Sequence, residues 1–251
     1  MLTSLIIPIY NEENHLTDFL ELLDSVDIGG EKELVFIDDC SKDKSFEILS
    51  QFSFQSKVQI LKNEVNQGKG SSLHKGITSA LGDIIVIQDA DFEYDPRELK
   101  DLIDRVRINK ADIVFGSRFK KSSYAVHRTF HYLINRILTL MSNALSGLYL
   151  TDMETCYKIF RSDIIKNITL ESRRFGFEPE VTAKIARLKV RVEELPISYH
   201  PRSYLEGKKI TWKDGVAAIC QIFYYNLFVS KSEYFKSTMP SKYLVGFQKW
   251  L

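Results

Sequence analysis

The sequence lacks three features that would place it in a specialised class of protein. Lysine and arginine total 34, and aspartate and glutamate total 33, so no general excess of positive charge favours binding to nucleic acid. No apolar run approaches the roughly 18 residues that a membrane-spanning helix needs. The N-terminus shows no basic segment followed by a cleavage site, and we therefore expect no secretory signal.

Cysteine is also scarce. Cys40, Cys156 and Cys220 are far apart in the chain, match no zinc-site spacing and cannot all pair with one another. This usage is typical of buried thiols in a reducing cytosol. The 44% hydrophobic and 27% charged residues are an ordinary globular balance, and the length suits one large α/β domain or two small ones.

The first half of the chain alternates short apolar runs with amphipathic segments. A strand followed repeatedly by a helix favours a mostly parallel sheet flanked by helices, the α/β class. The expected strands are 5–9, 34–37, 58–61, 84–87 and 113–115, and the expected helices are 16–23, 45–52, 70–80 and 96–107.

The second half is less regular. It predicts a long helix over 127–148, a late strand at 197–199 and an aromatic-rich amphipathic helix over 211–230. That last helix either packs on the core or lies in a membrane interface, and the lysines after it favour the interface. We expect a catalytic domain over 1–210, the amphipathic helix over 211–230 and a tail over 231–251.

The most informative motif is Asp89-Ala90-Asp91, directly after the apolar run 84–87. Residues two apart on an extended chain share a face, so both carboxylates can point the same way. They repel each other unless a cation lies near, and Mg²⁺ binds one or two carboxylates together with phosphate oxygens. The small Ala90 leaves room for a ligand against the backbone. The motif indicates a metal–diphosphate site; an exposed acidic turn is the alternative.

Polar residues follow the other expected strands as well. Tyr10 and Glu12 follow the first, Asp39 the second and Arg118 the fifth. Ligands of parallel α/β sheets bind beyond the carboxyl ends of the strands. Arg118 is therefore predicted to bind phosphate through its planar guanidinium, with a solvated surface arginine as the alternative.

The segment Gly68-Lys69-Gly70 precedes an expected helix. It lacks the spacing and the Gly-Lys-Ser/Thr order of a phosphate-binding P-loop. Its glycines either let a phosphate approach the helix start or simply begin the helix. A dehydrogenase is poorly supported, because no Gly-x-Gly-x-x-Gly follows the first strand.

Together, several motifs resemble the family 2 glycosyltransferases of GT-A fold, and most closely the branch that transfers hexoses to dolichol or polyprenol phosphate. The resemblance extends over about residues 3–228. It rests on these segments, in this order: 8–13 (PIYNEE), 37–39 (IDD), 66–70 (NQGKG), 89–91 (DAD), 116–118 (GSR), 152–158 (DMETCYK), 177–180 (FEPE) and 202–209 (RSYLEGKK).

The resemblance implies roles for individual residues. Those for the nucleotide base and ribose would be Pro8, Tyr10, Glu12 and Asp39. The donor diphosphate and a Mg²⁺ or Mn²⁺ ion would be bound by Lys69, Asp89, Ala90 and Asp91, with Glu93 as a third metal ligand. Those for phosphate groups would be Arg118, Arg202 and either Lys208 or Lys209.

The implied reaction is an inverting transfer from GDP-mannose, UDP-glucose or UDP-N-acetylglucosamine to dolichyl or undecaprenyl phosphate. It would take place on the cytoplasmic face of a membrane, with the enzyme peripherally bound. One alternative acceptor is a saccharide hydroxyl, which needs a general base. Asp152 is a candidate base, although orienting an arginine is its other possible role. The last alternative is a sugar-nucleotide binder without catalysis. Sugar, base and oligomeric state stay open.

Overall fold

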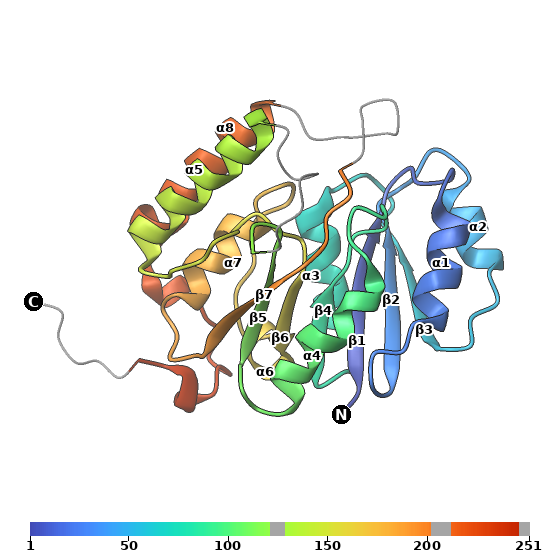
Figure 1. Ribbon diagram of the computed structural model, residues 1–251, viewed down its shortest axis with the longest axis horizontal. Helices are drawn as coiled ribbons and strands as arrows, with labels where there is room; N and C mark the ends of the chain where they lie inside the picture. The colour runs from blue at the N-terminus through green and yellow to red at the C-terminus, as the bar shows by residue number, and fades with distance from the viewer. Residues whose placement is uncertain (121–128, 202–211, 246–251) are drawn as a thin grey trace, which may run out of the picture.

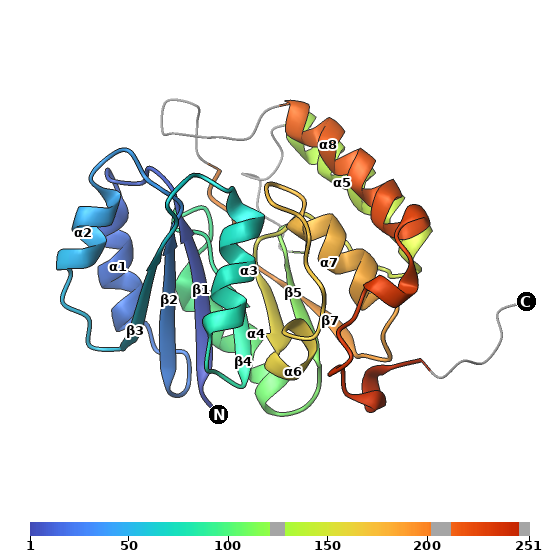
Figure 2. The same ribbon diagram turned by 180° about the vertical axis from the view of Figure 1, so that it is seen from behind.

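The computed structural model describes residues 1–120, 129–201 and 212–245. Its centre is a seven-stranded sheet in the order β3-β2-β1-β4-β6-β5-β7. Helices cover both faces, with α4 on one face in Figure 1 and α3 and α6 on the other in Figure 2. The strands are β1 (Thr3–Ile9), β2 (Lys32–Asp38), β3 (Lys57–Lys62), β4 (Ile84–Ile87), β5 (Ile113–Ser117), β6 (Lys158–Arg161) and β7 (Val192–Pro196).

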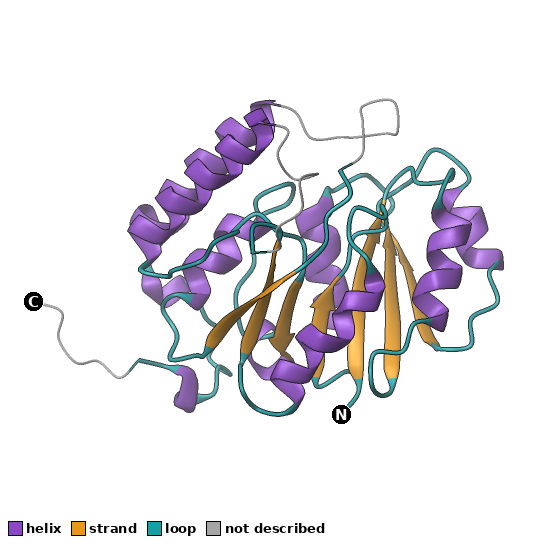
Figure 3. Ribbon diagram, viewed as in Figure 1, coloured by secondary structure: helices purple, strands orange, loops and turns teal. Residues whose placement is uncertain are grey.

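Some helices pack on the two faces of the sheet, and one pair of helices lies beyond it. Helices α5 and α8 lie side by side at the end of the molecule opposite α1 and α2 (Figures 1 and 3). The α-helices are α1 (Leu16–Ser25), α2 (Ser45–Gln51), α3 (Lys69–Ser79), α4 (Leu99–Arg107), α5 (Thr129–Ser146), α6 (Ser162–Ile165), α7 (Phe177–Ile185) and α8 (Trp212–Phe223). Short 3-10 turns span Pro96–Glu98, Lys231–Glu233 and Ser241–Tyr243, and a π-helix, Tyr224–Phe228, follows α8.

The central strands are apolar because both of their faces are covered. Every residue of β4 is fully buried, as expected for a β-branched run in a parallel sheet with helices on both sides. Strands β1 to β4 are parallel, but β6 runs antiparallel to both of its neighbours, β4 and β5. Strand β6 therefore begins at the edge where β1, β2, β4 and β5 end, and its preceding loop joins that edge.

The α/β class and the mostly parallel sheet are confirmed. The long helix predicted over 127–148 is present as α5 within the described residues, and it ends at Ser146. The predicted strand at 197–199 is wrong: the strand is β7, which ends at Pro196 and pairs in parallel with β5. Strand β6 and helices α6 and α7 were not predicted. Among the described helices, none combines the length and the apolar character required to cross a bilayer.

Candidate active site

The polar ends of the strands meet at one edge of the sheet. Lys69, at the first turn of α3, lies near the middle of this edge and binds two acidic side chains. Its Nζ is 3.0 Å from Asp89 Oδ2 and 3.2 Å from Glu178 Oε1 on α7. Burial alone would lower the pKa of Lys69, but the charges of Asp89 and Glu178 raise it well above its usual value. Lys69 thus stays protonated and links α3 and α7 to the end of β4.

Asp91 and Glu93 follow Asp89 in a tight turn. Asp91 Oδ1 accepts the Glu93 amide at 3.1 Å, and Ala90 between the two aspartates is buried. Within the described ranges, no group of three metal-ligating side chains is already assembled. Mg²⁺ commonly takes only one or two carboxylates and completes its shell with phosphate oxygens and water. The hard oxygen donors of this turn fit such an ion.

Arg118 leaves the end of β5 and binds Asp152 through two parallel hydrogen bonds. Its Nε donates to Asp152 Oδ2 and its Nη2 to Oδ1, both at 2.7 Å. Its backbone amide donates to the same Oδ2 at 3.0 Å. Both side chains are buried. Burial would lower the pKa of Arg118, and Asp152 raises it. Asp152 therefore orients the guanidinium, one of the two roles expected for it.

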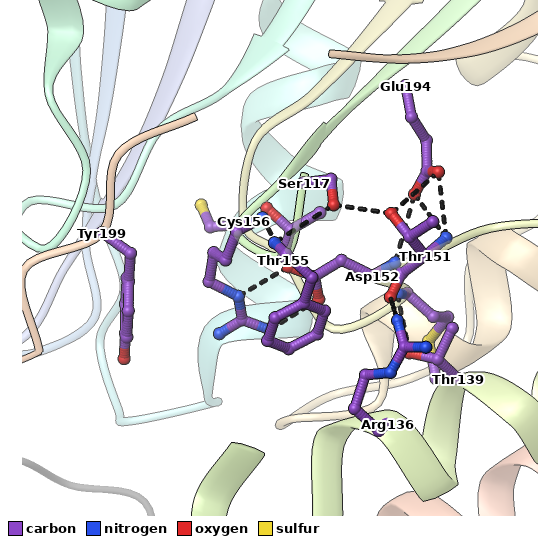
Figure 4. A network of polar contacts seen from close by, with 12 residues as sticks. Ser117, Arg136, Thr139, Thr151, Asp152, Thr155, Cys156, Glu194 and Tyr199 are labelled. Atoms are coloured by element: carbon purple, nitrogen blue, oxygen red, sulfur yellow. Dashed lines mark hydrogen bonds and ion pairs between the residues drawn. The ribbon is translucent and has the colours of Figure 1, made fainter. Parts of the chain in front are cut away.

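A further layer of contacts holds Asp152 (Figure 4). Glu194 on β7 accepts the backbone amides of Thr151 and Asp152 at 2.8 and 3.1 Å. On the other side of Arg118, the ring of Tyr199 lies 5.1 Å from the guanidinium carbon. The Tyr199 hydroxyl donates to Glu93 Oε2 at 3.2 Å. Tyr199 thus joins the turn after β4 to the arginine after β5.

Asp39, at the end of β2, holds the loop before α3. Its Oδ1 accepts the side-chain amide of Asn63 and the backbone amide of Gln67, and its Oδ2 accepts the amide of Gly68. Pro8, Tyr10 and Glu12 lie at the end of β1, partly buried, and the Glu12 amide donates to the Ser45 hydroxyl. The nucleotide roles of these residues stay predictions.

The glycines around Lys69 serve a packing purpose. The amides of Gly70 and Ser71 donate to the carbonyls of Arg174 and Arg173. A Cβ on Gly70 would lie 2.2 Å from the Ser172 carbonyl oxygen. These contacts favour the plain helix start over phosphate binding, because protein carbonyls already take the amides that a phosphate would use.

Some site residues are outside the described part of the chain, and others were not predicted. Arg202, Lys208 and Lys209 belong to the first group, and their phosphate roles stay predictions. The second group is Glu154, Lys158, Glu194 and Tyr199. Lys158 is fully buried and its Nζ donates to the carbonyls of Met153 and Thr155, so it shapes the loop before β6. Glu154 and Lys158 lie within the 152–158 motif, which was the available signal.

Sequence comparison identifies relatives over most of the chain. The glycosyl transferase family 2 profile matches residues 4–169. An undecaprenyl-phosphate mannosyltransferase of Micrococcus luteus is 32% identical over 81% of this chain and 85% of its own length. A dolichol-phosphate mannosyltransferase of Pyrococcus furiosus is 27% identical over 84% of this chain, but the match spans only 61% of that protein.

Solved structures share the fold at lower identity. Glucosyl-3-phosphoglycerate synthase of Mycobacterium tuberculosis, in complex with Mn²⁺, UDP and phosphoglyceric acid, gives a TM-score of 0.69 at 15% identity, over 91% of this chain and 80% of that one. S. aureus TarS in complex with UDP gives 0.58 at 18% identity, over 92% and 68%. The family match, the GT-A architecture and the acidic turn after β4 agree, and the chain belongs to glycosyl transferase family 2 as a glycosyltransferase.

Proposed function

We propose that this enzyme transfers a hexose from a nucleotide diphosphate sugar to a polyprenyl phosphate at a membrane surface. By their names, the Micrococcus and Pyrococcus relatives act with undecaprenyl and dolichol phosphate. The observation that carries the proposal is the Arg118–Asp152 pair. It fixes a buried guanidinium next to the acidic turn, where an acceptor phosphate needs a counter-charge and a defined orientation.

The donor would lie across the ends of β1, β2 and β4. Pro8, Tyr10 and Glu12 would bind the base and ribose. Asp89 and Asp91, with Glu93, would hold a divalent ion on the diphosphate. Such an ion supplies Lewis-acid neutralisation of the leaving nucleoside diphosphate. Lys69 adds a fixed positive charge beside Asp89, and Asp39 keeps the loop before Lys69 in place.

The acceptor would approach from the side of β5. A phosphate monoester has a second pKa of about 6, so it is largely deprotonated at neutral pH and needs no strong base. Arg118 would hold that phosphate in line with the anomeric carbon, and direct attack would invert the configuration there. A saccharide hydroxyl would need a general base instead, but both Asp152 oxygens already bind Arg118 and Glu178 binds Lys69.

The helix pair α5 and α8 is the surface that we propose to face the membrane. Large apolar side chains point to solvent on both helices and on the π-helix, an arrangement typical of interaction surfaces. Aromatic residues among them suit headgroup depth. The exposed side chains are Leu133, Ile137 and Leu140 on α5, and Val216, Phe223, Tyr224, Leu227 and Phe228 on α8 and the π-helix.

The decisive experiment measures transfer of radiolabelled hexose from UDP- and GDP-sugars to short-chain polyprenyl phosphate, with Mg²⁺, with Mn²⁺ and with EDTA. We expect labelled lipid from one donor, dependent on metal. In Asp91→Ala we expect a loss of about 100-fold or more, as for removal of one main electrostatic group. Donor hydrolysis or transfer to saccharides without a lipid product would exclude the proposed acceptor.

A further inference from the structure

The strand order arranges the parts of the ligand in a row. Between the outer strands β3 and β7, the sheet edge presents β2, β1, β4, β6 and β5 in that order. The base and ribose are assigned to β2 and β1, the diphosphate to β4, and the acceptor phosphate to β5. Strand β6 lies between β4 and β5 and begins at this same edge. The transferred hexose, which joins diphosphate and acceptor during reaction, therefore belongs above the start of β6.

Glu154 lies in the loop that enters β6. Two residues before it, Asp152 binds Arg118. Two residues after it, the thiol of Cys156 lies 3.9 Å from the Ile87 carbonyl at the end of β4. The charges that act most strongly on Glu154 are those of Glu178 and Lys158. Glu154 thus sits between the Lys69–Glu178 pair on the diphosphate side and the Arg118–Asp152 pair on the acceptor side.

Glu154 differs from its acidic neighbours in one oxygen of its carboxylate, Oε1. Its Oε1 is buried, and no residue in the described ranges donates a hydrogen bond to it. Burial first, and then the charge of Glu178, raise the pKa of Glu154 to about 7. A buried polar group without a partner is costly, and such groups in folded proteins call for an explanation by function or by a bound ligand.

The chemistry of the ligands restricts which of them can bind Glu154. The donor diphosphate and the acceptor phosphate carry negative charge and offer only acceptor oxygens, so a carboxylate repels both. The hexose carries several hydroxyl groups, each a hydrogen-bond donor. Among the parts of the proposed ligands that reach the start of β6, only the hexose supplies what a carboxylate oxygen accepts.

We propose that Glu154 is a specificity-determining residue whose carboxylate accepts a hydrogen bond from a hydroxyl group of the donor hexose. The assignment rests on the proposed function in taking a nucleotide diphosphate hexose as donor, but it does not depend on the acceptor. A site built to bind a substrate hydroxyl strongly rejects analogues that lack it. Glu154 would therefore discriminate between donors that share a nucleotide and differ at one sugar hydroxyl.

The test is a calorimetric binding titration without lipid acceptor. Its result is therefore independent of the transfer assay. Wild type, Glu154→Ala and Glu154→Gln are titrated with nucleoside diphosphate alone and with its hexose conjugates, in the presence of Mg²⁺. We expect Glu154→Ala to bind the preferred sugar nucleotide about 10-fold or more weakly, with little change for the nucleoside diphosphate. Glu154→Gln, which keeps an acceptor oxygen, is expected to lie between. Glu193→Ala, on β7 and paired with Arg105, is the matched control.

Three outcomes would overturn the assignment. An equal loss of affinity for nucleoside diphosphate and sugar nucleotide would show a general effect on the site. Unchanged sugar-nucleotide affinity in Glu154→Ala would show that Glu154 makes no hydrogen bond to the bound hexose. Absence of sugar-nucleotide binding to the wild type would remove the donor assignment as well. Binding that depends on Glu154, combined with failure of lipid transfer, would support this inference and exclude only the proposed acceptor.

Discussion

On the β1–β2 side of the site, the carboxylates of Asp39 and Asp43 bind mainly backbone amides, whereas on the β6–β5 side Asp152 also binds a buried guanidinium and Glu154 faces the charges of Glu178 and Lys158. Asp39 accepts the amides of Gln67 and Gly68, and Asp43 accepts those of Glu13 and Ser45. Their task is to fix loops. Across β4, the carboxylate of Asp152 instead holds the guanidinium of Arg118.

This difference separates loops held by hydrogen bonds from the buried charges at which we propose that the acceptor binds. Loops fixed by amide hydrogen bonds would give the nucleotide proposed to bind there the same surface in every catalytic cycle, at modest energetic cost. Buried charges are costly unless they are paired, and they strengthen electrostatic interactions with a substrate from which water is excluded. We therefore expect substitutions on the two sides to differ in size, in sign and in pH dependence.

The largest effect is expected for Asp152→Ala. It leaves the buried Arg118 guanidinium without its partner, and removing one member of a buried pair costs about 3–5 kcal/mol of unfolding free energy. Chemical denaturation measures this value. Asp39→Ala is the counterpart on the other side, where one buried side-chain amide and two partly buried backbone amides lose their acceptor at a cost of about 1–3 kcal/mol. Equal losses would show that the two sides do not differ in the proposed way.

A smaller loss of unfolding free energy is expected for Gly70→Ala, which disturbs the packing of the start of α3 against the backbone of residues 172–174. The added Cβ would meet the backbone oxygen of Ser172, and such overpacking costs about 1–3 kcal/mol. The matched control is Gly215→Ala in α8, where nothing lies within 4 Å of an added Cβ. There, the higher helix propensity of alanine is expected to stabilise the protein by up to about 1 kcal/mol.

The same division explains what could be predicted from the sequence. Strands β1, β2 and β4 are apolar runs followed by acidic residues, so the elements and the gathering of polar side chains at their ends could be predicted. Helix α7 was missed because its Glu178, Glu180 and Lys184 look solvent-exposed in sequence, yet all three are buried. They are neutralised by Lys69 and by the Lys184–Glu180 pair. Such pairing depends on tertiary contacts that no local pattern encodes.

The strands on the far side show the same limit. Strand β6 has only four residues, with Lys158 and Arg161 at its ends. The apolar run between them is too short to be recognised as a strand in the sequence. Strand β7 contains two glutamates and a proline, so the more apolar segment after it was preferred. One of those glutamates, Glu194, binds the amides of Thr151 and Asp152, a role that only the folded chain reveals.

For Glu154→Gln we expect a gain in unfolding free energy, whereas the substitutions of Asp152, Asp39 and Gly70 are expected to lower it. Because burial raises the pKa of Glu154 from its usual value of 4.5 to about 7, ionisation destabilises the folded state. The penalty is absent below about pH 4.5 and complete above about pH 7. The variant, which removes the buried charge, should therefore be more stable than the wild type by about 1–3 kcal/mol at pH 8 and nearly equal to it at pH 4. Chemical denaturation at both pH values, without ligand, measures the difference in unfolding free energy between variant and wild type. The same difference at both pH values would contradict the prediction.

The smallest effect is expected for Tyr199→Phe, and it tests whether the turn after β4 and the arginine after β5 act together. The variant loses the hydrogen bond to Glu93 but keeps the ring beside Arg118, so about 0.5–1.5 kcal/mol of stability should be lost. Combining it with Asp152→Ala in a double-mutant cycle measures the coupling. Additivity within about 0.5 kcal/mol would mean that the two groups are independent. A larger interaction energy would show that Tyr199 transmits the position of the acidic turn to the guanidinium that is proposed to hold the acceptor.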